Sequence, residues 1–120
     1  DLVELDGRYR MKYLGRVDNV INSGGIKLLP EIIEPKIAKL MSGRYFVVGI
    51  KDVVLGQRLC LIVEGMPLEP VRESILLNSI ANQLDKYEKP REIYYLEHFE
   101  MTDSGKIQRG KCIEKLGLER

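Results

Sequence analysis

Two apolar runs rich in β-branched and aromatic residues, 45–50 and 58–64, follow one another with only a short loop between them. Runs of this length and composition favour β-strands, and a short connection favours antiparallel pairing. A segment with the apolar spacing of a helix lies on either side, at 30–41 before the first run and at 69–84 after the second. A chain with this order buries its strands by packing helices against a sheet, which predicts an α+β fold.

Each of these two helices has an apolar face that we expect to be buried, because apolar residues recur at helical spacing. In the first helix the face comprises Ile33, Ile37, Leu40 and Met41. In the second helix the face comprises Val71, Ile75, Leu76, Ile80 and Leu84.

Shorter elements complete the pattern. A strand is predicted at 91–96, and a last short helix at 109–116, which Gly117 ends. Two hairpins precede the first helix, with strands expected at 2–5, 8–14, 20–22 and 26–29. The predicted fold is therefore α+β, with about three helices packed on a small, mainly antiparallel sheet and a short β-hairpin in front of it.

The charge of the chain is nearly balanced. It has 19 basic and 18 acidic side chains among 120 residues, so we expect neither nucleic acid nor an anionic membrane surface to be bound through bulk charge. No run approaches the ~20 apolar residues of a membrane span. Cys60 and Cys112 lack metal-ligand spacing, which predicts no metal site; a reduced, cytoplasmic setting fits them, although a disulfide stays possible from the sequence.

The loop 102–109 combines turn-forming residues with a lysine. Asp103, Ser104 and Gly105 favour a turn, and glycine permits positive φ and close approach to a ligand. Lys106 then projects as a compact charge that suits carboxylate or phosphate oxygens. On spacing alone, a solvated turn without a function explains the same residues.

Three stretches carry a more specific signal when they are taken together. They are 1–3; 15–34, with its Ser-Gly-Gly turn, Pro30 and Glu34; and 102–109, with Pro90 upstream. In this order they resemble the C-terminal part of adenylate-forming enzymes, the superfamily of acyl-CoA synthetases, peptide-synthetase adenylation domains and luciferases. Residues 15–28 look most like those of o-succinylbenzoate–CoA ligases of menaquinone synthesis.

The resemblance implies a division of the chain. In this family a small mobile α+β domain closes over a large N-terminal domain, which carries the acid substrate and most nucleotide contacts. By this resemblance, residues 1–14 are the tail of the large domain, 15–18 are the hinge, and 19–120 are the mobile domain. We therefore expect a piece of a longer chain whose partners are its own large domain and a small-molecule carboxylic acid.

The resemblance also implies roles for residues of the first stretches. Asp1 takes the place of an aspartate that accepts hydrogen bonds from the ATP ribose, and Arg16 that of an arginine that contacts the nucleotide. Asp18 takes the place of the hinge residue, which absorbs the change in φ and ψ. Without the resemblance, Arg16 and Asp18 read as ordinary surface charges.

Further residues correspond to positions at the reacting groups. Gly24 and Gly25 match a glycine loop beside the pantetheine channel of coenzyme A, where a side chain would narrow the channel; a simple turn needs the same residues. Lys27 could meet a coenzyme A phosphate. Lys106 matches the lysine that holds the substrate carboxylate against the α-phosphate and stabilises developing charge.

The function implied is that of a carboxylic acid–CoA ligase (AMP-forming), which uses ATP, coenzyme A and Mg²⁺ and makes an acyl-adenylate and then a thioester. The nucleotide site would lie mainly on the missing domain, so the 120 residues alone are expected to be inactive. Two alternatives stay open. One is an adenylation domain that loads a carrier protein, and the other is a non-catalytic α+β binding module.

Overall fold

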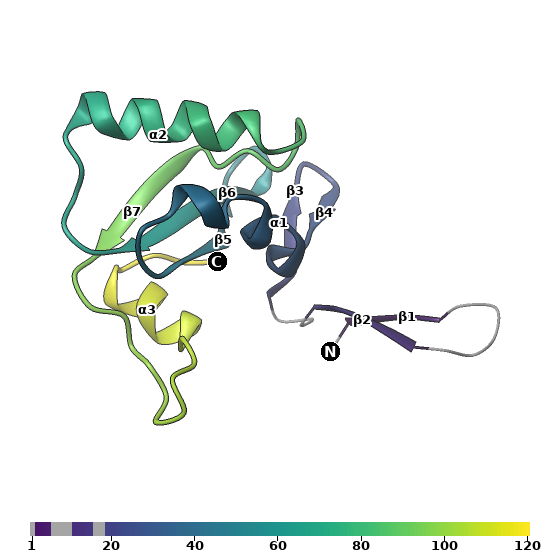
Figure 1. Ribbon diagram of the computed structural model, residues 1–120. Coiled ribbons are helices and arrows are strands. Elements are labelled where there is room, and N and C mark those ends of the chain that lie inside the picture. The colour runs from purple at the N-terminus through teal and green to yellow at the C-terminus, as the bar shows by residue number, and fades with distance from the viewer. Residues whose placement is uncertain (1, 6–10, 16–18) are drawn as a thin grey trace.

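The computed structural model describes residues 2–5, 11–15 and 19–120, the first two ranges by their backbone alone (Figure 1). β1 (Leu2–Leu5) and β2 (Met11–Gly15) pair antiparallel and form a separate two-stranded sheet. The predicted hairpin at the start of the chain is thus confirmed. The sequence signal for its turn, the Asp6-Gly7 pair, lies outside the described residues.

The main sheet has five strands in the order β4-β3-β6-β5, with β7 also paired to β6. Their bounds are Ile21–Ser23 (β3), Ile26–Leu28 (β4), Tyr45–Asp52 (β5), Gly56–Glu64 (β6) and Glu92–Leu96 (β7). β5 and β6 pair antiparallel over their full length, as predicted. β7 pairs with β6 in parallel, because helix α2 crosses over between these two strands.

The first helical segment is shorter than predicted. α1 covers Pro30–Lys36, and a separate 3₁₀ turn, η2, covers Ala38–Leu40, so no single helix runs from 30 to 41. Ile37 leaves helical geometry at φ −110° and ψ 5°. Pro35 has no backbone N–H to donate to the preceding turn, which weakens the helix at this end. Ile33 and Ile37 are nevertheless buried, as the apolar spacing predicted.

α2 (Pro70–Asn82) corrects the second predicted face. Ile80 and Leu84 are buried, but Val71 and Ile75 are 71% and 60% exposed. Helical spacing tells which residues share a face, whereas the reach of the sheet decides how much of that face is covered. Only the C-terminal half of the helix packs on the core. The last helix, α3 (Arg109–Lys115), agrees with its prediction.

The sheet is buried on both faces, which explains the near-continuous apolar runs of β5 and β6. Side chains alternate along the strands, so neighbours in sequence enter opposite cores. One core, which packs beneath α1 and α2, comprises Ile21, Leu28, Ile33, Ile37, Val47, Leu59, Leu61, Ile80 and Leu84. The other, beneath α3, comprises Phe46, Val48, Ile50, Cys60, Ile62, Phe99, Cys112 and Ile113. Figure 1 shows α2 and α3 on opposite sides of the sheet.

Gly49 lies in β5 where the neighbouring side chains leave no room for a methyl group. A Cβ at this position would come within 2.7 Å of Ile21 Cγ2 and 2.9 Å of the Gln57 side chain. Ile21 is fully buried and cannot move aside freely. We expect Gly49→Ala to lower the free energy of unfolding by about 1–3 kcal/mol, as overpacking does, in urea unfolding followed by circular dichroism.

Gly43→Ala is the matched control for this experiment. Its added methyl would have only one heavy atom within 4 Å, a backbone oxygen at 3.9 Å, and its φ is not positive. We expect a change within about 0.5 kcal/mol for this control. Equal stability of the Gly49 variant and the control would contradict the close packing of β5 on β3.

Candidate functional site

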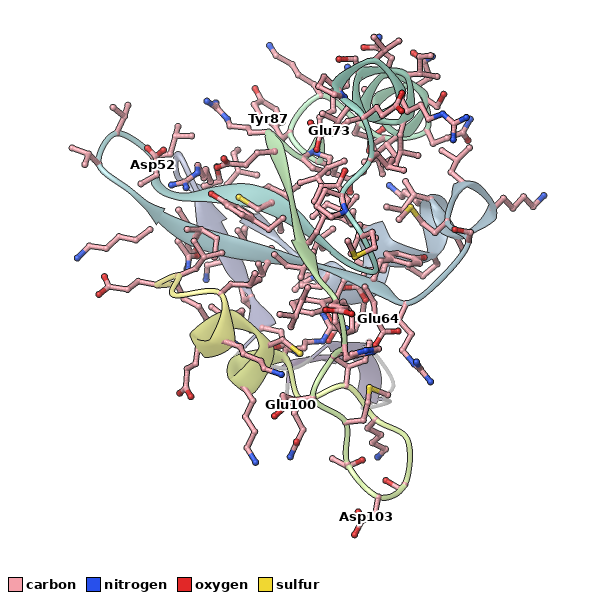
Figure 2. The ribbon with its side chains drawn as sticks, turned by 90° about the vertical axis from the view of Figure 1, so that its left-hand side faces the viewer. Asp52, Glu64, Glu73, Tyr87, Glu100 and Asp103 are labelled. Atoms are coloured by element: carbon pink, nitrogen blue, oxygen red, sulfur yellow. The ribbon has the colours of Figure 1, made fainter. Side chains whose placement is uncertain are left out.

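The Lys106 loop, residues 102–106, is a closed turn held by its own backbone. The Thr102 N–H donates to the Lys106 carbonyl at 2.8 Å, and the Gly105 N–H donates to the Thr102 carbonyl at 2.9 Å. The Thr102 Oγ1 accepts the Lys106 N–H at 3.0 Å and contacts the Ser104 hydroxyl. Gly105 has φ +87°, a positive value of the kind that glycine permits. Figure 2 shows Asp103 at the far tip of this loop.

The base of the loop is tied to the body of the domain. Met101 and Ile107 form an antiparallel bridge, and the Gln108 N–H donates to the Glu100 carbonyl at 2.8 Å. The Glu100 N–H also donates to Cys112 Sγ of α3 at 3.3 Å. Burial raises the pKa of this thiol, so Cys112 supports the loop as a neutral group. The loop therefore has a defined position on the domain.

Lys106 itself is exposed, and no ion pair joins it to any residue in the described part of the chain. The closed turn fixes its backbone while its side chain stays in solvent. A cation presented in this way can meet a carboxylate or phosphate brought from outside the domain. The geometry agrees with the role that the resemblance implies for Lys106, but does not by itself assign it.

The residue three positions further on is held very differently. Arg109, the first residue of α3, donates from both terminal nitrogens to the two carboxylate oxygens of Glu34 in α1, at 2.7 and 2.8 Å. Glu34 also accepts the Val47 N–H at 2.9 Å, and the guanidinium lies 5.2 Å from the centre of the Phe46 ring. Burial opposes the charge of Arg109, but the hydrogen bonds and charge of Glu34 outweigh it and raise the pKa of Arg109.

The tandem glycines form the turn between β3 and β4. Gly24 has φ +58° and Gly25 φ +84°, conformations that favour glycine. The Gly24 N–H donates to the Leu55 carbonyl at 2.8 Å, and a Cβ on Gly24 would lie 3.3 Å from the Leu55 side chain. Nothing lies within 4 Å of a Cβ on Gly25. Lys27 lies on β4 with an exposed side chain.

A cavity of about 240 Å³ opens beside this turn. Its cationic lining consists of Lys86, Lys89 and Arg91, which follow α2. The ring of Tyr87 also lines it, and Lys86 Nζ lies 5.4 Å from the centre of that ring. Gly24 belongs to the lining, whereas Gly25 and Lys27 do not. Cations with an exposed aromatic ring suit a ligand that has both phosphate groups and a planar ring.

The remaining predicted site residues, Asp1, Arg16 and Asp18, lie outside the residues that the structure describes. Of the others, the structure brings Gly24, Gly25 and Lys27 together in one hairpin. It places Lys106 on a loop between β7 and α3, well apart from that hairpin (Figure 1).

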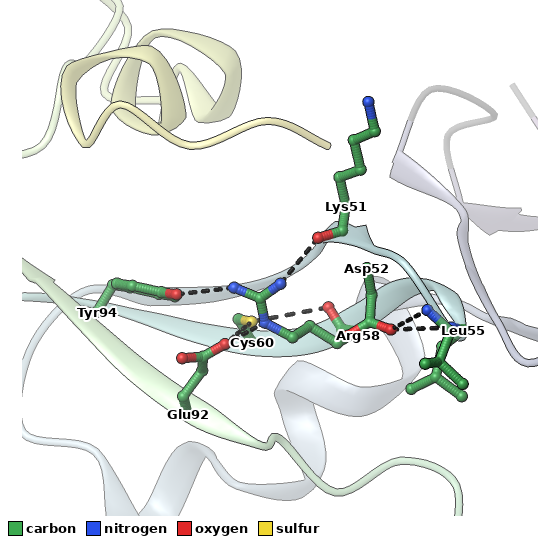
Figure 3. Close-up of polar contacts among 8 residues, drawn as sticks. Lys51, Asp52, Leu55, Arg58, Cys60, Glu92 and Tyr94 are labelled. Atoms are coloured by element: carbon green, nitrogen blue, oxygen red, sulfur yellow. Dashed lines mark hydrogen bonds and ion pairs between the residues drawn. The ribbon is translucent and has the colours of Figure 1, made fainter.

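Arg58 is the centre of a polar network on the sheet rather than of a catalytic site (Figure 3). It pairs with Glu92 and donates to the Tyr94 hydroxyl at 3.0 Å and the Lys51 carbonyl at 2.8 Å, which joins three strands. Burial raises the pKa of the adjacent Cys60 thiol to about 12. Since both cysteines are free and buried with raised pKa values, neither supplies a thiolate nucleophile at neutral pH.

Two further features are absent from the part of the chain that the structure describes. Within these ranges, no group of three or more His, Cys, Asp or Glu side chains could hold a metal ion. No helix there has the length and apolar character that crossing a membrane requires.

Reasoning from the sequence missed two groups of residues. Glu34 and Arg109 both lie in the stretches that carry the resemblance, but nothing in the sequence joins positions 75 residues apart. The cations of 86–91 are close together in the sequence, and their density was a visible signal. Their position beside Gly24 is decided by the packing of β7 and its preceding loop on the sheet.

The chain has relatives among known sequences and among solved structures. No protein-family model matches the chain. A probable 2-succinylbenzoate–CoA ligase of Mycobacterium tuberculosis is 31% identical over 88% of the chain and 28% of that relative. A mitochondrial medium-chain acyl-CoA ligase of Rattus norvegicus is 25% identical over 97% of the chain and 19% of that relative. The chain thus spans from about a fifth to somewhat over a quarter of the length of these curated relatives.

Solved structures give the same result. An acyl-CoA synthetase (AMP-forming)/AMP-acid ligase II-like protein of Dyadobacter fermentans has a TM-score of 0.75 and 34% identity, over 97% of this chain and 34% of that one. An anthranilate–CoA ligase has a TM-score of 0.72 at 21% identity, which shows the shared fold alone. The chain therefore has acyl-CoA ligases and related adenylate-forming enzymes as its relatives in sequence and structure, and it matches only part of the length of each, which is consistent with a C-terminal domain.

Proposed function

We propose that the chain is the C-terminal lid domain of an ATP-dependent carboxylic acid–CoA ligase. A carboxylate oxygen of the acid attacks the α-phosphorus of ATP and pyrophosphate leaves; the sulfur of coenzyme A then attacks the acyl carbon and AMP leaves. The observation that carries the proposal is the closed Lys106 loop, which presents a lysine without an ion-pair partner among the described residues. The relatives of the chain support the reaction class.

In the first step, Lys106 would bring together two anions that repel each other. Its ammonium would lie between the acid carboxylate and the α-phosphate, where negative charge increases on the transferring oxygens. Asp1 and Arg16 would contact the ribose and phosphates. Because Mg²⁺ binds chiefly to the ATP phosphates, we assign it to the large N-terminal domain, together with most of the ATP site. The chain by itself would be inactive.

In the second step, the cavity beside Gly24 would receive coenzyme A. Its Lys86, Lys89 and Arg91 side chains suit the phosphates of the nucleotide, and Tyr87 offers a ring for stacking on adenine. Lys27, which is exposed on β4, would add a more distant positive charge. A carrier protein presents a single phosphate on its pantetheine arm, so this concentration of positive charge favours free coenzyme A as acceptor.

The Lys106 loop and the glycine turn lie on different sides of the domain (Figure 1). One orientation of the domain cannot easily bring both to the same acyl group. This separation supports two orientations, one for each step, with rotation at a hinge at residues 15–18 centred on Asp18. Residues 1–14 would then belong to the large domain and 19–120 to the lid.

The acid that we propose is 2-succinylbenzoate, which would place the enzyme in menaquinone biosynthesis in the cytoplasm. Support comes from residues 15–28 and from the 31% identical relative. A carrier-loading adenylation domain is the second candidate, because a glycine turn would border the same pantetheine channel. A non-catalytic module is the third candidate, and it predicts no effect of any change at Lys106.

The acceptor can be tested with the full-length protein, ATP, the acid, and either coenzyme A or a phosphopantetheine-bearing carrier protein. We expect the thioester to form with coenzyme A and not with the carrier protein. Lys89→Gln should raise KM for coenzyme A roughly tenfold, because a hydrogen bond between charged groups contributes about 1.5 kcal/mol. KM should be measured with saturating ATP and acid.

Lys39→Gln, an exposed lysine in η2 outside the cavity, is the matched control and should leave KM unchanged. Transfer to the carrier protein in preference to coenzyme A would contradict the proposed acceptor. An unchanged KM in Lys89→Gln would instead contradict the placement of the nucleotide in the cavity.

A further inference from the structure

We propose that Glu34 and Arg109 are positioning residues for adenylate formation, which hold the Lys106 loop at a fixed place on α1. The inference rests on the proposed function of Lys106. It adds that the ion pair between α1 and the start of α3 sets where the lysine stands when the domain closes. Neither residue needs to touch the substrate for this role.

The pair has the geometry of a rigid connection. Two parallel hydrogen bonds of 2.7 and 2.8 Å fix the plane of the guanidinium relative to the carboxylate. The Val47 N–H donates a third bond to Glu34, and the Phe46 ring lies against the guanidinium. The side chains of Arg109 and Glu34 are only 23% and 16% exposed, so water screens the pair less than a surface ion pair.

The Lys106 loop lies close in sequence to the Glu34–Arg109 pair, because Arg109 is only three positions after Lys106. Ile107 and Gln108 form one side of the base of the loop, and Arg109 follows them directly. A shift of Arg109 is therefore passed to Lys106 over three residues. Cys112 contacts the other side of the base, because its sulfur accepts the Glu100 N–H, but a neutral thiol makes only a weak hydrogen bond. Glu100 also forms an ion pair with Lys115 of α3 at 3.8 Å, and Met101 and Ile107 pack against the core beneath α3. The Glu34–Arg109 pair, with its two short hydrogen bonds, is the strongest polar attachment of the loop among the described residues.

α1 is also attached next to the proposed hinge. Asn19, the first described residue after 15–18, donates to Glu31 of α1 at 3.5 Å. Without the Glu34–Arg109 pair, the loop would keep its internal hydrogen bonds and its base, but its position relative to α1 would be less tightly fixed.

The test uses the full-length protein and measures the two half-reactions separately. Glu34→Gln and Arg109→Gln should each lower kcat for pyrophosphate exchange roughly 10- to 100-fold, because misplacement of a catalytic group by about 1 Å has an effect of that size. KM for ATP and thioester formation from supplied acyl-adenylate should change less than about threefold, because Lys106 takes no part there. Loss of folding alone would lower both half-reactions together.

A double-mutant cycle tests whether the two residues act as one unit. The double variant should be no slower in pyrophosphate exchange than the slower single variant. Arg109→Lys, which keeps the charge without the two-pronged contact, should recover only part of the rate. Melting temperatures will show whether the glutamine variants fold. If Arg109→Gln does not fold, Arg109→Lys takes its place in the test.

Two variants measured in parallel separate the possible outcomes. Glu88→Gln makes the same chemical change in another ion pair, because Glu88 contacts Lys36 of α1 at 2.7 Å. This control should keep the wild-type rate of pyrophosphate exchange. If Lys106→Ala is slow but Glu34→Gln and Arg109→Lys match the wild type, the positioning role is wrong. Additive losses, or equal losses in both half-reactions, would overturn it as well. A normal rate in Lys106→Ala would instead refute the proposed function.

Discussion

Lys106→Ala in the full-length enzyme is expected to slow adenylate formation by roughly 10²- to 10³-fold, the usual effect of removing one electrostatic contact to a transition state. The acid carboxylate and the α-phosphate would then meet without a cation between them. Thioester formation from supplied acyl-adenylate should change far less, because the proposed second orientation moves the loop away. Pyrophosphate exchange measures the first step, and the loss of the free thiol of coenzyme A measures the second.

Lys111→Ala is the matched control, because Lys111 is an exposed lysine on the neighbouring α3. It should leave both half-reactions at the wild-type rate. An unchanged rate of pyrophosphate exchange in Lys106→Ala would show that this lysine is an ordinary solvated residue. The non-catalytic alternative would then gain support.

Phe46→Ala is expected to cause the largest loss of stability, about 3–5 kcal/mol, as for other fully buried phenylalanines. Phe46 is fully buried in the core beneath α3 and packs edge-on against Phe99, with ring centres 5.3 Å apart. Removal of its ring leaves a cavity and also removes the surface on which Arg109 rests. Urea unfolding of the chain, followed by circular dichroism, measures the change.

Val53→Ala supplies the reference for this measurement. Val53 is fully exposed in the loop between β5 and β6, so its truncation should change the free energy of unfolding by less than about 0.5 kcal/mol. A loss of under about 1 kcal/mol in Phe46→Ala would contradict the tight packing of the second core.

Much of the fold was predictable because its signals are local. The β-rich runs at β5 and β6 are apolar at successive positions, which strands buried on both faces require. Gly117 and the proline at the start of α1 mark helix ends through their own backbone properties. The exposed Val71 and Ile75 in α2 were not predictable, because helical spacing contains no information on where the sheet ends.

The candidate site divides in the same way. The Lys106 loop is built from bonds among residues at most four apart, so its turn followed from the sequence, and Gly105 supplies the positive φ that the turn adopts. The cavity joins Gly24 to the cations of 86–91, and the ion pair joins Glu34 to Arg109. Such contacts depend on how strands pair and how helices pack, and no local pattern encodes them.

The sequence by itself therefore determined the α+β class, the order of the elements, the two turns with their glycines, and the resemblance to adenylate-forming enzymes. Each of these depends on neighbouring residues, whose φ, ψ and side-chain preferences act over a few positions. Only the tertiary structure decided that β7 lies parallel to β6, that Lys106 lacks a described partner while Arg109 has one, and that cations collect beside Gly24. These features arise from burial shared between distant segments, which forms only when the whole sheet is assembled.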